Sequence, residues 1–219
     1  IETVIGGIGD DTFVGSTGTD DSLSYASING AVTIDFTGAN TGTVSTVTQG
    51  VDSFSGMENI IGSTSNDIFN GAIGGVAIDG FGGASDRLSY IDSSAAVTIT
   101  FAADSDTSGT VTGNANATFI NVEHVQGSTA ADVIDGSAIT NNLSIYVLGS
   151  EGDDTITGGA GDDSVAGELL GVSSLVERDM DITALGLPLY VTEKDQEQLF
   201  YTSNRSTEII CGTGDSFAR

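Results

Sequence analysis

The stretch Gly158-Gly159-Ala160-Gly161-Asp162-Asp163-Ser164-Val165-Ala166 decides how this chain folds, because it fits the nine-residue pattern G-G-x-G-x-D-x-U-x, where U is a large apolar residue. The same pattern occupies residues 6–14 and, with Ser in place of one Gly, residues 149–157. Glycine permits a tight turn and a close backbone approach, which lets carbonyl oxygens point inward. The Asp adds an anionic oxygen, and Ca²⁺ collects six to eight oxygens. The pattern therefore predicts calcium-binding turns, each followed by a short strand.

A single turn of this kind can neither complete a coordination sphere nor bury its apolar residue, whereas stacked turns can do both. We place such nonapeptides, several of them degenerate, at 6–14, 15–23, 62–70, 71–79, 80–88, 127–135, 136–144, 149–157 and 158–166. At 71–79, where Val76 stands in place of the Asp, a metal-free packing turn is the favoured interpretation.

A longer repeat of 65 residues organises the chain. DSLSY at 21–25 recurs as DRLSY at 86–90, AVTIDF at 31–36 recurs as AVTITF at 96–101, and ENIIG at 58–62 matches EHVQG at 123–127. A third copy of the last element, ETVIG at 2–6, lies 56 residues before the second, and the missing nine correspond to 71–79. A stack of interchangeable turns tolerates such a change. The segments 24–61 and 89–126 alternate apolar and polar residues, so we expect them to extend the solenoid or to form a small side sheet.

The composition favours a cation-loaded protein. The chain has 219 residues with 31 acids against 5 bases, a formal charge of -26, which argues against nucleic acid and anionic membranes as partners. No apolar run of the length of a transmembrane helix occurs. The single Cys211 excludes an internal disulfide, and the single His124 lies in a strand-like segment without further zinc ligands. Since no catalytic set is present, we expect no enzymatic activity from this chain.

The character of the sequence changes after residue 167. We expect a β-roll array over 1–167 and a C-terminal cap, linker or start of a further domain over 168–219, where Thr192–Tyr201 reads as a short helix. Because the chain starts at Ile1 in mid-pattern, we also expect it to be a piece of a longer protein.

The nonapeptides and their stacking resemble the repeats-in-toxin (RTX) family of haemolysin-type calcium-binding repeats. The resemblance implies an all-β, parallel β-roll or β-solenoid that binds several Ca²⁺ ions, with nonapeptide strands alternating between two faces and with longer β-coils inserted. Carried over to this sequence, it implies that Asp67 faces Asp86, Asp132 faces Asp154, and Asp163 faces Asn141. The remaining implied metal ligands are Asp11 and Asp21, whose partner turns would lie upstream, and the carbonyls of Gly7, Gly9, Gly152, Gly159 and Gly161.

The resemblance also implies a bacterial, extracellular or cell-surface protein that is exported unfolded by a type I system and folds on external Ca²⁺. We expect a structural module of a surface-layer, adhesin or matrix protein, with neighbouring copies or other surface components as further partners. The alternatives are the C-terminal secretion and folding module of an exported hydrolase, such as a protease or lipase, or a binding module for glycan or a partner surface.

Overall fold

The computed structural model describes residues 3–46, 50–113 and 115–166 in full, and beyond them the backbone of four further strands. All regular elements of this described part are strands, which form two long sheets and one small sheet. The described part contains no helix with the length and apolarity needed to cross a membrane.

Sheet A has ten strands. They are β1 (Thr3–Ile5), β3 (Ser22–Ser24), β7 (Asn59–Ile61), β9 (Val76–Asp79), β11 (Val97–Phe101), β12 (Gly109–Gly113), β13 (Ala117–Ile120), β15 (Val133–Asp135), β17 (Asp154–Thr157) and β19 (Val172–Val176). Their spatial order is β1-β3-β7-β9-β13-β12-β11-β15-β17-β19.

Sheet B has nine strands. They are β2 (Thr12–Val14), β4 (Val32–Gly38), β5 (Thr41–Thr46), β6 (Gly50–Ser55), β8 (Ile68–Asn70), β10 (Arg87–Ser89), β14 (His124–Gln126), β16 (Tyr146–Leu148) and β18 (Ser164–Ala166). Their spatial order is β18-β16-β14-β10-β8-β4-β5-β6-β2.

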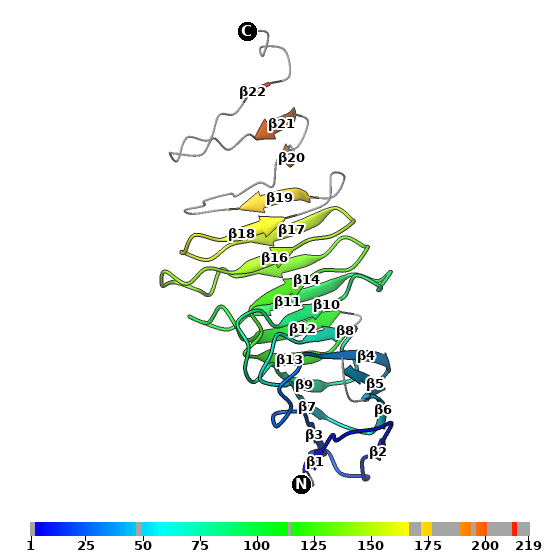
Figure 1. Ribbon diagram of the computed structural model, residues 1–219. Helices are drawn as coiled ribbons and strands as arrows, with labels where there is room; N and C mark the ends of the chain where they lie inside the picture. Colours follow the sequence, from blue (N-terminus) through cyan, green and yellow to red (C-terminus); the bar gives the residue numbers. More distant parts are fainter. Residues whose placement is uncertain are drawn as a thin grey trace.

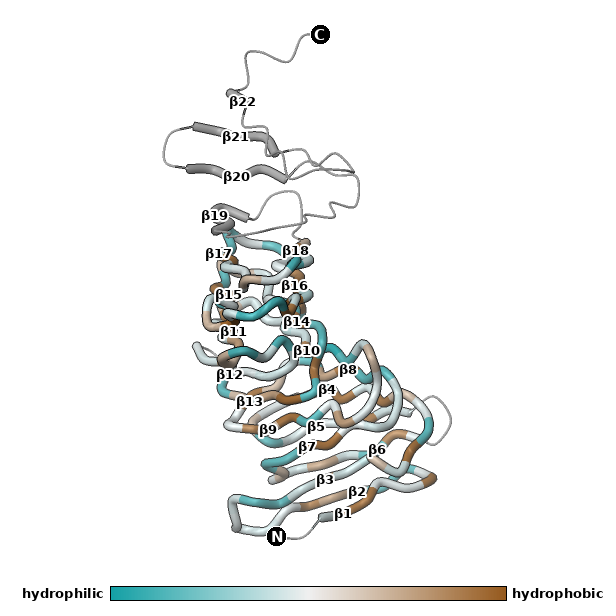
Figure 2. The backbone as a smooth tube through the Cα atoms, turned by 90° about the vertical axis from the view of Figure 1, so that its left-hand side faces the viewer, coloured by the Kyte–Doolittle hydropathy of each residue, from teal (hydrophilic) through white to brown (hydrophobic). Residues whose placement is uncertain are grey.

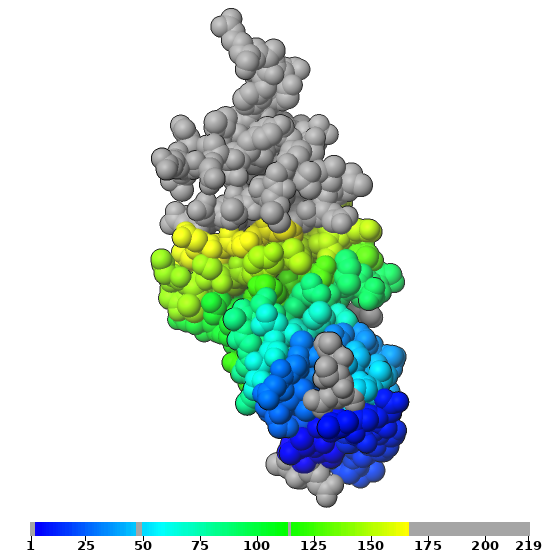
Figure 3. Space-filling model, in the orientation of Figure 1, coloured from blue at the N-terminus to red at the C-terminus, as the bar shows by residue number. Residues whose placement is uncertain are grey.

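Successive nonapeptides place their strands alternately in the two sheets, which face each other along an elongated column (Figures 1 and 2). The colour bands of Figure 3 follow one another along this column, so neighbours in sequence are neighbours in the stack. Strands of equivalent turns pair in parallel, as in β8–β10–β14–β16–β18. The predicted all-β parallel roll is therefore confirmed, and the alternation follows from short strands separated by glycine-rich turns.

The two long coils enter the sheets as antiparallel meanders. Strands β4, β5 and β6 lie within sheet B, whereas their counterparts β11, β12 and β13 lie within sheet A. The second 65-residue unit is displaced to the opposite sheet because the extra nonapeptide at 71–79 adds one strand, β9, before it. The coils thus extend the solenoid, one of the two arrangements expected, and form no separate side sheet among the described residues.

The U residues of the nonapeptides and the alternating residues of the meanders fill the space between the sheets. Leu23 and its repeat mate Leu88 are fully buried. The aromatic pair Phe36–Phe54 packs edge-to-face with ring centroids 5.5 Å apart, and the equivalent pair in the second unit, 65 residues on, repeats this at 5.8 Å. Residues at equivalent sequence positions thus pack in the same way in the two units.

The prediction of a short helix at 192–201 is wrong. Strands β20 (Leu189–Glu193) and β21 (Gln196–Phe200) form an antiparallel pair there, extended by β22 (Gly212–Thr213). Helix propensity is a weak prior that strand pairing readily overrides.

Candidate metal centre

Acidic side chains gather at the start of many strands of the roll, either directly before a strand or within its first three residues, and form two columns that we call the acid ladders. The sheet A ladder contains Asp21, Glu58, Asp132 and Asp154, and the sheet B ladder contains Asp11, Asp52, Asp67, Asp86, Glu123 and Asp163.

A carboxylate in either ladder accepts a backbone N–H from the neighbouring turn. The donor occupies the ladder position one strand nearer the N-terminal end of the stack. The pairs, donor first, are Asp11–Asp52 at 2.9 Å, Asp21–Glu58 at 3.0 Å, Val32–Asp67 at 2.8 Å, Asp67–Asp86 at 2.6 Å, Asp86–Glu123 at 2.7 Å, Val97–Asp132 at 2.7 Å, Asp132–Asp154 at 2.9 Å and Ile145–Asp163 at 3.0 Å. These bonds fix the position of each accepting carboxylate between two turns.

In four of the turns, those of Asp21, Asp67, Asp132 and Asp163, the second carboxylate oxygen accepts a backbone N–H from the turn to which the acid belongs. The Oδ2 of Asp132 accepts the Ser128 N–H at 2.5 Å, while the Ser128 hydroxyl donates to Oδ1 at 2.8 Å. The same bonds, at the same distances, join Ser63 to Asp67 in the first unit. These bonds within the protein orient the two carboxylates without the help of a bound ion.

A carbonyl oxygen of the next turn faces this Oδ2 beside the first glycine of the turn. A methyl group built on Gly127 would lie against Asp132 Oδ2 and 2.5 Å from the Gly149 carbonyl oxygen. Only glycine leaves this space open, so the turn contains a cradle between a carboxylate oxygen and a carbonyl oxygen.

Three further glycines lie in cradles of the same composition. With the oxygens that converge on them, they are Gly62 (Asp67 Oδ2 and Gly80 O), Gly80 (Asp86 Oδ2 and Asn121 O) and Gly15 (Asp21 Oδ2 and Gly56 O). The carbonyls of Asn121 and Gly56 belong to the inserted coils. The coils therefore complete cradles that the nonapeptides alone leave open.

The ladders are electrostatically prepared for a cation. Burial raises the pKa of Asp86 to about 7, and the neighbouring Asp67 and Glu123 carboxylates add to this increase, although the Asp67 N–H opposes it. Burial likewise raises the pKa of Asp154 to about 7 against the bond from the Asp132 N–H, while the Asp132 carboxylate adds to the increase. Buried, mutually repelling carboxylates gain from a positive ion between them.

The structure brings together two of the three predicted pairs. Asp67 and Asp86 occupy neighbouring ladder positions in sheet B, and Asp132 and Asp154 occupy neighbouring ladder positions in sheet A. Their coordination of an ion stays a prediction.

The third predicted pair is not brought together. Asn141 is exposed and bonds to the Leu143 N–H and the Asp104 carbonyl, whereas Asp163 accepts the Ile145 N–H. The buried, apolar Ile145 occupies the ladder position next to Asp163, at which Asn141 was expected. The turn before β16 is longer than a nonapeptide, which moves Asn141 out of register.

Asp11 and Asp21, expected to need upstream turns, donate their N–H groups to the downstream Asp52 and Glu58. Asp11 is exposed and Asp21 is buried.

Three of the five predicted glycines, Gly152, Gly159 and Gly161, lie at close approaches between turns. A methyl group on Gly152 would collide with Ala130, one on Gly159 with Ile139 and one on Gly161 with the Leu143 carbonyl. A methyl group on Gly7 would lie 3.7 Å from Asp11 Oδ2, and Gly9 has open space around it with a φ of 111°. The Gly159 N–H also donates to Asp163 Oδ2 at 2.8 Å. Coordination by their carbonyls stays a prediction.

Sequence reasoning missed Asp52, Glu58 and Glu123 as ladder acids. Glu58 and Glu123 share the 65-residue offset and precede an apolar strand, a signal that could have found them. Asp52 had no such signal, because its counterpart in the second unit is Ala117. In the fold it is buried, and its Oδ2 accepts the Tyr25 hydroxyl at 2.6 Å.

These donors suit Ca²⁺. The described residues contain no cluster of three or more His, Cys, Asp or Glu side chains that could hold a metal, so a site in the ladders must draw on backbone carbonyls. One carboxylate and facing carbonyls are the hard oxygen ligands that Ca²⁺ prefers, and nitrogen or sulfur ligands for a transition metal are lacking in the cradles.

Stacked parallel turns with an oxygen cradle at four of their glycines are the arrangement expected of a calcium-binding β-roll. Comparison with known families agrees: residues 1–21 and 146–169 match the RTX calcium-binding nonapeptide repeat, in four copies. Over these residues the chain contains RTX calcium-binding repeats, which are a structural calcium-binding module. No curated protein matched the sequence.

Proposed function

We propose that this chain is an extracellular structural module of a secreted bacterial RTX-like protein, a surface-layer, adhesin or matrix component, that folds on Ca²⁺ binding after export. The array over 1–167 acts as a spacer, and 168–219 is its cap, linker or the start of a further domain. The observation that carries the proposal is the pair of cradles completed by Gly56 and Asn121, because it makes the long coils part of the calcium-binding stack.

The acid ladders also support the folding switch. Carboxylates placed one strand apart repel each other, and the chain as a whole carries a charge of -26, so the ion-free chain is expected to stay open. A bound Ca²⁺ would supply the positive charge that links neighbouring turns. Since extracellular modules bind Ca²⁺ with Kd on the order of 0.1–1 mM, folding would wait until export.

The alternative function is a secretion and folding module of an exported hydrolase whose catalytic domain lies outside this chain. The long meanders favour the structural role, because a minimal secretion module needs only compact nonapeptide runs. Sequence of the parent protein separates the two: further 65-residue units support the spacer, and an adjoining hydrolase domain supports the alternative.

The experiment is far-UV circular dichroism during a Ca²⁺ titration that starts from EDTA-treated protein. We expect a cooperative gain of β signal between about 0.1 and 10 mM Ca²⁺ that Mg²⁺ does not reproduce. A chain that is already folded in EDTA and indifferent to Ca²⁺ would refute calcium-triggered folding.

A further inference from the structure

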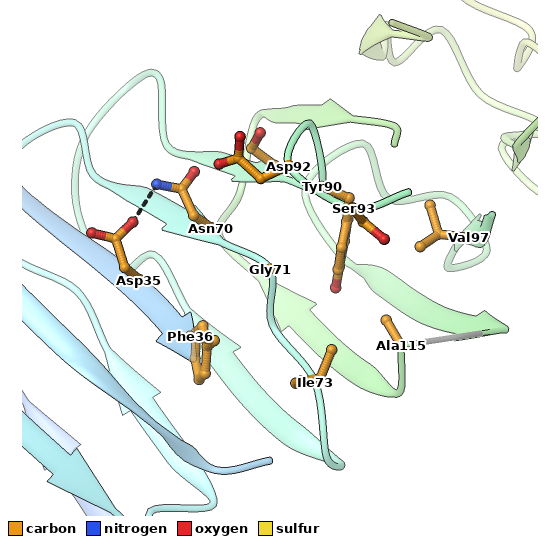
Figure 4. Close-up of a pocket in the computed structure, with 11 residues that line it drawn as sticks. Asp35, Phe36, Asn70, Gly71, Ile73, Tyr90, Asp92, Ser93, Val97 and Ala115 are labelled. Atoms are coloured by element: carbon orange, nitrogen blue, oxygen red, sulfur yellow. Dashed lines mark hydrogen bonds between the residues drawn. The ribbon is translucent and has the colours of Figure 1, made fainter. Parts of the chain in front are cut away.

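A cavity of about 440 Å³ opens beside sheet B, where β8 and β10 end next to the longer strand β4 (Figure 4). None of the ladder acids lines it. Its rim carries Asp35, Asn70 and Asp92, and its wall includes Phe36, Ile73 and Val97. The volume falls within the range of about 300–1,000 Å³ that is usual for small-ligand sites.

The rim offers mainly hydrogen-bond acceptors. The Asn70 amide donates to Asp35 Oδ1 at 2.7 Å, and among the described residues this bond uses neither the Asn70 carbonyl oxygen nor the second Asp35 oxygen. Figure 4 shows the exposed carboxylate of Asp92 on the other side of the same amide. The hydroxyls of Ser89 and Ser93 already donate to acceptors that do not line the cavity, at 3.0 Å each.

The wall below the rim is apolar, and the Phe36 ring, which packs edge-to-face against Phe54, stays partly exposed there. Phe36 is half-buried beside Asp35, whereas Phe101, its counterpart in the second unit, is 1% exposed. No basic residue lines the cavity. A ligand that fits must therefore bring donors, positive charge and an apolar stem.

A primary alkylammonium group has these properties. Its nitrogen carries three donors and no acceptor, and its methylenes pack on apolar surface. An anion would meet two carboxylates without a base. A neutral polyol would find few donors for its own oxygens. Ca²⁺ needs six to eight oxygens, and much of this cavity is apolar.

We propose that this cavity binds the side chain of a lysine on a partner protein, with the ammonium at Asp35, Asn70 and Asp92 and the methylenes over Phe36. The ring can add a cation–π attraction. The chain's net charge of -26 steers such a cation toward the surface. The proposal is independent of whether the module is a spacer or a secretion module.

The test is a ¹H–¹⁵N NMR titration of the full, Ca²⁺-saturated chain with Nα-acetyl-lysine methylamide at physiological salt. We expect saturable shifts at Gly71 and at the Asn70 side-chain amide. The corresponding norleucine compound, which has the aliphatic chain without the ammonium, should give no comparable shift.

Two variants that each remove one negative charge make the test specific. Asp35→Thr introduces the residue found at the equivalent position of the second unit, Thr100, in an equivalent strand, and should weaken binding about tenfold or more. Asp106→Asn removes a charge outside the cavity and should leave the affinity unchanged.

The proposal fails if the lysine compound gives no saturable shift, or if the norleucine compound gives the same one. Equal weakening by Asp35→Thr and Asp106→Asn would reveal nonspecific attraction to an acidic protein and would also overturn it. If additional Ca²⁺ alone reproduces the shifts, the cavity is a metal site and not a lysine site.

Discussion

Replacing Asp132 by Ala tests whether the ladder carboxylates organise their turns. Asp132 is 1% exposed and accepts the Ser128 N–H at 2.5 Å, the Ser128 hydroxyl at 2.8 Å and the Val97 N–H at 2.7 Å. The hydroxyl can rotate toward another acceptor, but the two N–H groups stay buried without one. At about 1–3 kcal/mol each, their loss amounts to about 2–6 kcal/mol, a large part of the stability of a domain.

Because of the 65-residue repeat, the same substitution can be tested at Asp67, which is equivalent to Asp132. Asp67 accepts the Ser63 N–H, the Ser63 hydroxyl and the Val32 N–H at 2.5, 2.8 and 2.8 Å. Asp67→Ala should therefore cost the same as Asp132→Ala within about 1 kcal/mol, although the two residues lie in different sheets.

The measurement is urea unfolding at saturating Ca²⁺, followed by circular dichroism and analysed at equal denaturant slope. Asp162→Ala is the control, because Asp162 is exposed and should change the free energy of unfolding by no more than about 0.5 kcal/mol. If Asp132→Ala does not fold, Asp132→Asn, which keeps one acceptor oxygen, should show an intermediate loss. Costs for Asp132→Ala and Asp67→Ala as small as that of the control would refute the reasoning.

Three further predictions concern the cradles and their charge. Gly127→Ala fills a cradle, so equilibrium dialysis should count one bound Ca²⁺ fewer than in the unchanged chain. Gly38→Ala is the control, because Gly38 has open space around it, and should leave the stoichiometry unchanged. Equal stoichiometry in the two variants would contradict the cradle. Asp163→Ala should raise the Ca²⁺ midpoint of folding more than Asp162→Ala in a dichroism titration, and equal midpoints would remove Asp163 from the ligand set. In metal-free protein, the pKa of Asp86, raised from 3.8 to about 7, contributes stability that is full below about pH 4 and is lost as the pH rises through 7. In EDTA, far-UV circular dichroism should therefore show more β signal at pH 5 than at pH 7.5, and the opposite trend would refute the assignment.

Much of the fold could be predicted because each nonapeptide contains the residues that determine its turn and its strand. The glycines of 158–166 specify a turn, Asp163 supplies a carboxylate and Val165 supplies the buried strand residue, all within nine residues. The recurrence of AVTIDF as AVTITF likewise predicted equivalent strands, and β4 and β11 occupy them. Local patterns succeed where the interactions that they require are local.

The site was predicted less completely, because its partners come from neighbouring turns. Asn141 matched the spacing of a ligand, but the longer turn before β16 places Ile145 at the ladder position instead. Glu58 and Glu123 lie outside the nonapeptides, yet the stack delivers them to ladder positions beside Asp21 and Asp86.

By itself, the sequence determined that this chain is an acidic tandem array of calcium-type turns, since turn conformation, charge and strand burial are all set by residues close together in the chain. Only the tertiary structure decided which carbonyl faces which carboxylate. The carbonyl of Asn121 reaches the cradle of Gly80 because parallel stacking aligns turns that the sequence separates by a whole meander. That alignment depends on the summed lengths of all intervening turns and strands, a property that no single motif contains.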